Sequence, residues 1–328
     1  MKKLITLALI IVLLAGLLTG CTGRGNDDDT YLVGILQLFD HAALDASREG
    51  FVARMAEHGF VEGENTTFIL QNAQMDMSIA SQMAEYLVSR NPALILTIAT
   101  GASQAVARAT EEIPIVITAV TSPEGAELVE SNQRPGRNVT GVSDLTPVAQ
   151  QMDLITRLLP EARVVGLLYN AGEVNSRIQA DLARAAINAM PGFSYIAATA
   201  PSMADVADVA ASLVGRVDVI YIPTCNTIAG AYATVVLVAD EAGIPVIAGE
   251  VGGVRAGALA TEGIDYYLLG RQTADMAVQI LRGEAVPATM PIQWQLEPGV
   301  LTINSDSAAR LGITIPDEIL NSATIITD

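Results

Sequence analysis

The feature that most constrains the fold is a regular alternation of short apolar runs with longer amphipathic segments, which begins at Tyr31. Strand–helix–strand repetition with short connections predicts parallel sheets covered by helices on both faces. Right-handed crossovers then make each sheet doubly wound, so we predict an α/β fold. The predicted strands are 31–38, 67–71, 94–98, 115–118, 164–169, 193–197, 219–222, 246–248 and 258–261, and the predicted helices are 42–58, 78–89, 147–159, 174–189, 203–214, 228–242 and 266–281.

The length of the chain, 328 residues, predicts two lobes, because single domains are usually about half as long. We expect the chain to cross between the lobes near 138–144, near the glycine-rich segment 249–257 and near 287–293. Because the chain is expected to cross three times, each lobe should consist of two segments that are separated in the sequence. The N-terminal lobe then comprises 31–142 with 254–287, and the C-terminal lobe 143–253 with 288–328. A single split at mid-chain is the alternative.

The N-terminal residues predict export. Met1-Lys2-Lys3 is positively charged, and the uncharged apolar stretch 4–18 has the length of a signal-peptide core rather than of a membrane span. It ends in Leu18-Thr19-Gly20-Cys21, which resembles the lipobox of bacterial lipoproteins. We therefore predict a signal peptide over 1–20, lipidation of Cys21, a polar tether over 21–30 and an extracytoplasmic, membrane-anchored protein.

Composition and motifs exclude several classes of function. The sequence has 36 acidic and 18 basic residues, a formal charge of −18, and lacks the basic clusters that nucleic-acid binding requires. With Cys21 lipidated, Cys225 has no partner for an intrachain disulfide. We find no metal-ligand spacing, P-loop, dinucleotide fingerprint or Gly-x-Ser-x-Gly motif. We therefore expect no metal, no cofactor and no catalytic residue.

A ligand site is expected where polar side chains follow the predicted strands. In open parallel sheets, ligands bind beyond the carboxyl ends of the strands, and with two lobes that edge of each sheet faces the cleft. Directional hydrogen-bonding groups there suit a small polar molecule that becomes enclosed on lobe closure. The residues expected at this site are Gln37, His41, Thr100, Thr121, Ser122, Tyr169, Asn170, Asn175, Thr224, Asn226 and Glu250.

Some of these residues have a simpler alternative role. Thr100-Gly101 opens a predicted helix whose free N–H groups would hold a carboxylate, but Thr100 could instead be a plain N-cap. His41, Asn170 and Asn226 could likewise cap the helices that follow them. Both readings stay open at each position.

Many short segments, in order along nearly the whole chain after the tether, resemble one known family. They include Gly34-Ile35-Leu36-Gln37, Gly59-Phe60-Val61-Glu62-Gly63, Asn138-Val139-Thr140-Gly141-Val142-Ser143-Asp144, Gly166-Leu167-Leu168-Tyr169-Asn170, Tyr221-Ile222-Pro223-Thr224 and Asp265-Tyr266-Tyr267-Leu268-Leu269-Gly270-Arg271. The family is the substrate-binding lipoproteins of ABC transporters with the type 1 periplasmic-binding fold, in the branch that includes aromatic amino-acid binders.

The resemblance implies a monomer that captures a small polar solute by hinge closure and delivers it to an ABC permease with its ATPase. The solute implied by the resemblance is an amino acid, and an aromatic one is favoured. His41 matches a ligand-facing histidine of the family. Family members usually carry Asp at two turns where this chain has Ser122 and Cys225. We count Cys225 in the expected site, although it could be a small buried residue.

The missing aspartates lie where a carboxylate would be expected to meet a ligand cation, and Glu250 could supply one negative charge instead. Two other classes of function stay open. One is a lipoprotein that presents the same site to a signalling receptor, and the other is an enzyme of similar topology.

Overall fold

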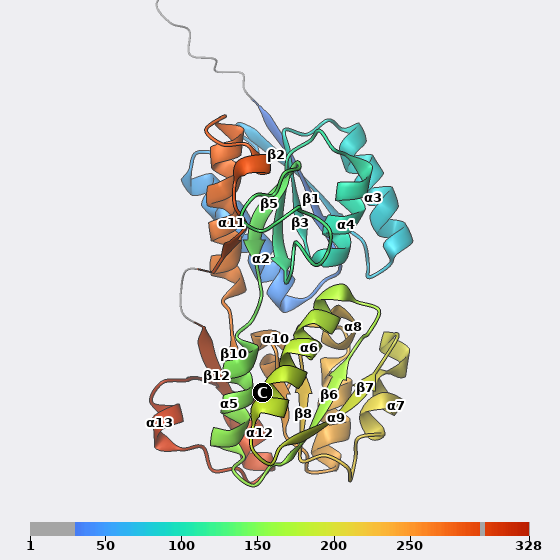
Figure 1. The fold of residues 1–328 in the computed structure, drawn as a ribbon. Helices are drawn as coiled ribbons and strands as arrows, with labels where there is room; N and C mark the ends of the chain where they lie inside the picture. The colour runs from blue at the N-terminus through green and yellow to red at the C-terminus, as the bar shows by residue number, and fades with distance from the viewer. Residues whose placement is uncertain (1–29, 296–298, 328) are drawn as a thin grey trace, which may run out of the picture.

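The computed structural model describes residues 30–295 and 299–327. They form two α/β lobes, one above the other in Figure 1, and each lobe has its own sheet. The predicted signal peptide and most of the predicted tether, including Cys21, lie outside the described residues. Within the described part of the chain, no helix has the length and apolar character needed to cross a membrane.

The first sheet is parallel throughout and has the strand order β11-β5-β4-β3-β1-β2. Strands β3, β4 and β5 are buried along their whole length, and β3 and β4 are accordingly apolar except for one threonine each. The strands are β1 (Tyr31–Gln37), β2 (Thr66–Asn72), β3 (Leu94–Ile98), β4 (Ile115–Val120), β5 (Val139–Ser143) and β11 (Gln293–Trp294).

Helices cover both faces of this sheet. On one face, α2 and α11 pack so closely that a Cβ at Gly270 would lie 1.9 Å from the Ser47 carbonyl oxygen, and one at Gly50 would lie 2.0 Å from that of Tyr267. Only glycine permits this approach. The helices of the lobe are α2 (Ala42–Glu57), α3 (Met77–Ser89), α4 (Thr100–Ala109), α11 (Tyr266–Leu281) and the short η2 (Pro287–Thr289).

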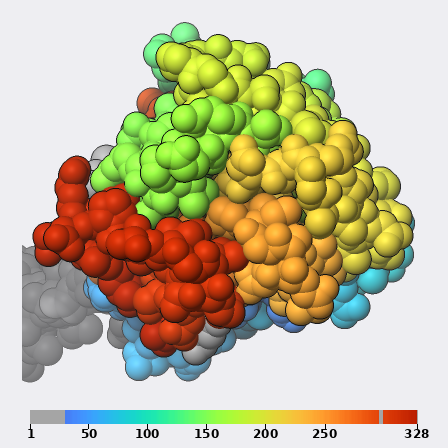
Figure 2. Space-filling model, turned by 90° about the horizontal axis from the view of Figure 1, so that it is seen from below, coloured from blue at the N-terminus to red at the C-terminus, as the bar shows by residue number. Residues whose placement is uncertain are grey.

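The second sheet has the order β13-β12-β10-β9-β8-β6-β7, with one antiparallel pair, β10 with β12. Seen from below (Figure 2), the C-terminal segment, in red, lies beside the green and orange segments. The strands are β6 (Val164–Tyr169), β7 (Ser194–Thr199), β8 (Val219–Ile222), β9 (Val246–Ala248), β10 (Ala260–Gly263), β12 (Val300–Asn304) and β13 (Thr324–Ile326). The helices are α5 (Val148–Leu158), α6 (Val174–Ala189), η1 (Met203–Asp205), α7 (Val206–Ala211), α8 (Asn226–Ala229), α9 (Tyr232–Glu241), α10 (Val251–Arg255), α12 (Ser305–Arg310) and α13 (Asp317–Leu320).

The chain passes between the sheets three times, but two passages differ from the predicted positions. The first follows β5, at the end of the predicted segment 138–144. The second follows β10 rather than lying at 249–257, because β10 pairs with β9 and β12 in the second sheet. The third follows β11, which pairs with β5, so 288–294 belong with the first sheet. Strand pairing therefore assigns residues 254–263 to the C-terminal lobe and residues 288–294 to the N-terminal lobe, the reverse of the expected assignment.

Candidate functional site

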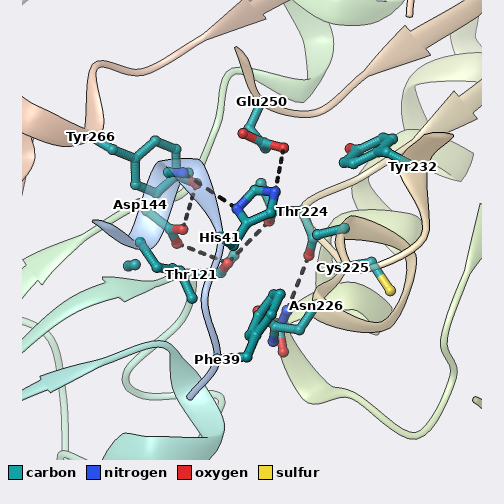
Figure 3. Close-up of a pocket in the computed structure, with 15 residues that line it drawn as sticks. Phe39, His41, Thr121, Asp144, Thr224, Cys225, Asn226, Tyr232, Glu250 and Tyr266 are labelled. Carbon is teal, nitrogen blue, oxygen red and sulfur yellow. Dashed lines mark hydrogen bonds and ion pairs between the residues drawn. The ribbon is translucent and has the colours of Figure 1, made fainter. Parts of the chain in front are cut away.

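The polar ends of strands from both lobes meet around a small cavity of about 30 Å³ (Figure 3). It lies where the carboxyl ends of the two sheets face each other, as expected for parallel sheets. A cavity of this size holds one or two water molecules. Its lining residues are Phe39, His41, Ala43, Leu44, Ala119, Thr121, Asp144, Asn175, Thr224, Cys225, Asn226, Ala229, Tyr232, Glu250 and Tyr266.

The two lobes touch directly across this cavity. The hydroxyl oxygens of Thr121, which follows β4, and Thr224, which follows β8, lie 3.4 Å apart. Strand β4 is irregular just before this point, and Ala119 has a φ of 54°, a strained value for a residue with a side chain. Such irregularities redirect side chains at the end of a strand, and here Thr121 lies in the cavity wall.

A buried carboxylate, Asp144, lies at the first passage between the lobes. Its two oxygens accept hydrogen bonds of 2.9 Å from the hydroxyls of Thr121 and Tyr266. Burial, together with the smaller effect of the nearby Glu250 charge, raises the pKa of Asp144 from 3.8 to about 6, in spite of these hydrogen bonds. No basic side chain forms an ion pair with Asp144 among the described residues, so the ionised form lacks a cationic partner.

A second carboxylate, Glu250, faces the same cavity. It precedes α10, and its oxygens accept from the N–H groups of Gly252, at 2.6 Å, and Gly253, at 3.0 Å. The Nε2 atom of His41 lies 3.8 Å from Glu250 Oε1, and the Nδ1 atom of His41 accepts from the Ala43 N–H and so caps α2. Figure 3 shows the Glu250 carboxylate facing the His41 imidazole, and Asp144 next to Thr121 and Tyr266.

The second lobe holds its part of the site through Glu173, at the start of α6. Its carboxylate accepts from the N–H of Asn226 at 2.9 Å, the amide of Asn226 at 2.9 Å and the N–H of Thr227 at 2.8 Å. Asn175 donates to the Thr224 carbonyl oxygen at 3.0 Å. These contacts fix the loop between β8 and α8 and the start of α8, where Thr224, Cys225 and Asn226 line the cavity.

The remaining wall is apolar and aromatic. Phe39, Ala119 and Ala229 line it together with the rings of Tyr232 and Tyr266. The Tyr232 hydroxyl is buried and makes no hydrogen bond of ordinary geometry to the described residues. Burial, with Glu250 nearby, raises the pKa of Tyr232 well above its usual range. This hydroxyl is therefore a neutral group that can still bind a ligand or a water molecule.

A larger hollow of about 1240 Å³ adjoins the cavity and shares Asn175 and Asn226 with it. Thr100 and Asn170, expected in the site, line this outer hollow instead. Asn170 donates to Thr227 Oγ1 at 2.8 Å and accepts from the Gly172 N–H at 2.8 Å, so its side chain is largely committed to local structure. The hollow is lined by residues of both lobes.

Three expected residues line neither hollow. Gln37 is buried and bonds to the Phe39 carbonyl, Asp45 and Arg48. The Ser122 hydroxyl accepts from the Gly125 N–H, and Tyr169 bonds to Arg184. The structure thus gives these side chains partners within their own lobes, and the expectation that they line the site is not met in this arrangement.

Several residues that hold or line the site were not singled out from the sequence as site residues, and the polar ones among them include Asp144, Glu173, Tyr232 and Tyr266. Asp144 and Tyr266 lie within segments that carry the family resemblance, which was a usable signal. Glu173 directly precedes a helix, where an acidic residue usually serves as a cap. For Tyr232, which sits on a mostly apolar helix, the sequence offers no signal that distinguishes it from a core residue.

Comparisons with known proteins agree with this architecture. A tyrosine-binding protein of Clostridioides difficile (strain R20291) is 36% identical over 321 residues, which cover 94% of this chain and 92% of the relative. A solved structure from Streptococcus pneumonia, described as an ABC domain in complex with L-Trp, is 34% identical, with a TM-score of 0.87 over 91% of this chain and 100% of the other.

The ligand-free, open structure of a substrate binding protein with adhesive properties from Clostridium difficile is 39% identical, with a TM-score of 0.72 over 90% of this chain and 99% of the other. The family model for ABC transporter substrate binding proteins matches residues 32–326. The chain therefore belongs to the ABC transporter substrate-binding protein family.

Proposed function

We propose that this protein captures an aromatic amino acid between its lobes and delivers it to an ABC importer from the outer side of the membrane, to which lipidated Cys21 anchors it. The observation that carries the ligand assignment is the buried pair of carboxylates, Asp144 and Glu250. Buried charges in proteins are paired, and Asp144 has only neutral donors. An α-ammonium group supplies the missing positive charge.

The two carboxylates also provide the negative charge that is missing at Ser122 and Cys225, where the family usually has aspartate. The aspartates expected at those two positions are absent, but Asp144 and Glu250 reach the cavity from other strand ends. The negative charge that an amino-acid ligand needs is therefore supplied from different positions. The site remains suited to a cation although both turns have lost their carboxylates.

The aromatic part of the ligand is supported by the apolar wall and by two relatives. Phe39, Tyr232 and Tyr266 offer ring surfaces for stacking or edge contacts, and Ala119 and Ala229 leave space beside them. One relative is named as tyrosine-binding and a neighbouring structure contains L-Trp. We propose that the aromatic ring lies against this wall with the ammonium group toward Asp144.

Capture requires the lobes to move. A cavity of about 30 Å³ is far smaller than the several hundred Å³ of ordinary ligand pockets, and the Thr121–Thr224 contact closes it. The TM-score is higher with the L-Trp complex, 0.87, than with the open, ligand-free structure, 0.72, although the latter is closer in sequence. Both facts support a hinge that opens to admit the ligand and closes around it.

The test is calorimetric titration of the soluble protein, residues 22–328, with L-tyrosine, L-tryptophan and L-phenylalanine. Native mass spectrometry of the purified protein, followed by denaturation, identifies any ligand carried through purification. N-acetyl-L-tyrosine keeps the ring but loses the positive charge, and we expect it not to bind. Equal binding of the acetylated compound would contradict the role of the carboxylates, and no binding of any aromatic amino acid would refute the ligand assignment. Loss of ligand uptake in cells that lack the cognate ABC permease would separate an importer from a signalling lipoprotein.

A further inference from the structure

One side chain that does not line the cavity contacts both lobes and the first passage between them. It is Gln179, which lies on α6 and is fully buried. Its Nε2 atom donates to Thr121 Oγ1 at 3.4 Å and also to Thr224 Oγ1. Its Oε1 atom accepts from Thr146 Oγ1 at 3.0 Å and from the Thr224 N–H at 3.4 Å. A primary amide has two donor and two acceptor positions, so all four are used.

The partners of Gln179 come from three different parts of the molecule. Thr121 belongs to the first lobe, Thr224 to the second, and Thr146 to the segment that joins β5 to α5. Thr121 and Thr224 also line the cavity. Gln179 therefore lies behind the two threonines through which the lobes meet, and it ties them to the connecting segment.

Opening the lobes changes the hydrogen bonding of Gln179 directly. Separating Thr121 from the second lobe breaks its contacts with Gln179 and Thr224. Thr121 keeps its bond to Asp144, which lies on its own side of the cleft. The Gln179 amide, however, loses Thr121 as a partner and must bond to water instead, so opening costs the net contribution of that hydrogen bond. The full set of bonds exists only while the lobes are together.

We propose that Gln179 is a positioning residue that stabilises the closed form and couples the ligand site to the hinge. The proposal rests on the proposed function for the identity of the ligand and for the opening and closing of the lobes. Because these bonds exist only while the lobes are together, removing them disfavours the closed form both with and without ligand. The expected effect is faster ligand release with little change in the rate of ligand capture.

The test compares Gln179→Met with a matched control, Gln151→Met. Gln151 is also a fully buried glutamine, but its bonds to the Gly249 and Glu262 carbonyls and to the Tyr221 hydroxyl all lie within the second lobe. A purely structural loss should therefore be the same for both variants. Gln179→Glu keeps the shape and the acceptor atoms but loses both donors, and it serves if the methionine variant does not fold.

Stopped-flow fluorescence with L-tyrosine and L-tryptophan gives the association and dissociation rates, and small-angle X-ray scattering gives the separation of the lobes. We expect the dissociation rate of Gln179→Met to rise about tenfold, with association within about threefold and with a larger radius of gyration in the ligand-free protein. Gln151→Met should change neither the dissociation rate nor the radius.

Unchanged dissociation and an unchanged radius in a folded Gln179 variant overturn the proposal, as does an equal rise in dissociation for Gln151→Met. If the wild-type protein binds neither amino acid, the proposed ligand is refuted. The scattering of the ligand-free variants alone then decides the role of Gln179.

Discussion

Replacing Asp144 by asparagine should change folding stability and ligand binding in opposite directions. Burial raises the pKa of Asp144 from 3.8 to about 6, and each unit corresponds to about 1.4 kcal/mol. A raised carboxyl pKa means that the folded protein holds the proton more tightly than the unfolded chain does. The ionised form therefore lowers the free energy of unfolding by up to about 3 kcal/mol at pH 7, and by only about 1 kcal/mol at pH 4.5.

Asparagine is neutral at every pH, so Asp144→Asn removes this penalty. We expect the ligand-free variant to be more stable than the wild type at pH 7, by about 1 to 3 kcal/mol, and the difference to shrink at pH 4.5. The lower end allows for imperfect hydrogen bonds between the amide and the Thr121 and Tyr266 hydroxyls. Urea unfolding followed by circular dichroism at the two pH values measures the difference.

The same variant should bind its ligand at least about 30-fold more weakly at pH 7, because a buried charge pair is lost. Calorimetric titration with L-tyrosine and L-tryptophan measures this. Tyr266→Phe is the matched control: it removes one hydrogen bond to Asp144 but keeps the charge and the aromatic ring, and it should weaken binding less. An Asp144→Asn protein that is destabilised at pH 7, or that binds with wild-type affinity, refutes the reasoning.

Three further predictions concern the same site. Ligand affinity should fall about tenfold per pH unit below pH 6, because an ammonium ligand requires ionised Asp144; calorimetry between pH 4.5 and 8 tests this, and a flat profile contradicts it. Glu173 does not line the cavity, but Glu173→Gln should weaken ligand binding about tenfold in calorimetric titration, because it disturbs the contacts with the N–H groups of Asn226 and Thr227. Wild-type affinity in this variant would show that these contacts are not needed to position the loop. Burial raises the pKa of the Cys225 thiol to about 12, so N-ethylmaleimide should label this thiol slowly at pH 8. With ligand bound, labelling should be slower by at least about tenfold. Mass spectrometry after timed quenching measures the labelled fraction, and equal labelling rates with and without ligand contradict the prediction.

The strands and helices themselves were largely predictable. Parallel strands buried on both faces are usually near-continuous apolar runs, and β3, β6, β8 and β9 begin and end at the predicted residues. Helices such as α6 and α11 were found at their predicted bounds for a related reason, since one face of each is periodically apolar. Sequence pattern thus determined the α/β class and the number of lobes.

The boundary between the lobes was not predictable to the same degree. The segment 249–257 contains several glycines and looked like a passage, yet α10 and β10 stay in the second lobe because β10 pairs with β9 and β12. Similarly, β11 joins the first sheet through only two paired positions with β5. Strand pairing is a property of two distant segments, and local composition carries little information about it.

The site divides in the same way. Sequence alone determined that polar groups at strand ends face one cleft, and His41, Thr121, Asn175, Thr224, Cys225, Asn226 and Glu250 do line the cavity. Only the tertiary structure decided that Gln37, Ser122 and Tyr169 bond within their own lobes, and that Asp144 and Tyr266 meet at the passages between the lobes. A residue's type and its place after a strand are local properties, whereas its partners depend on how the two lobes pack against each other.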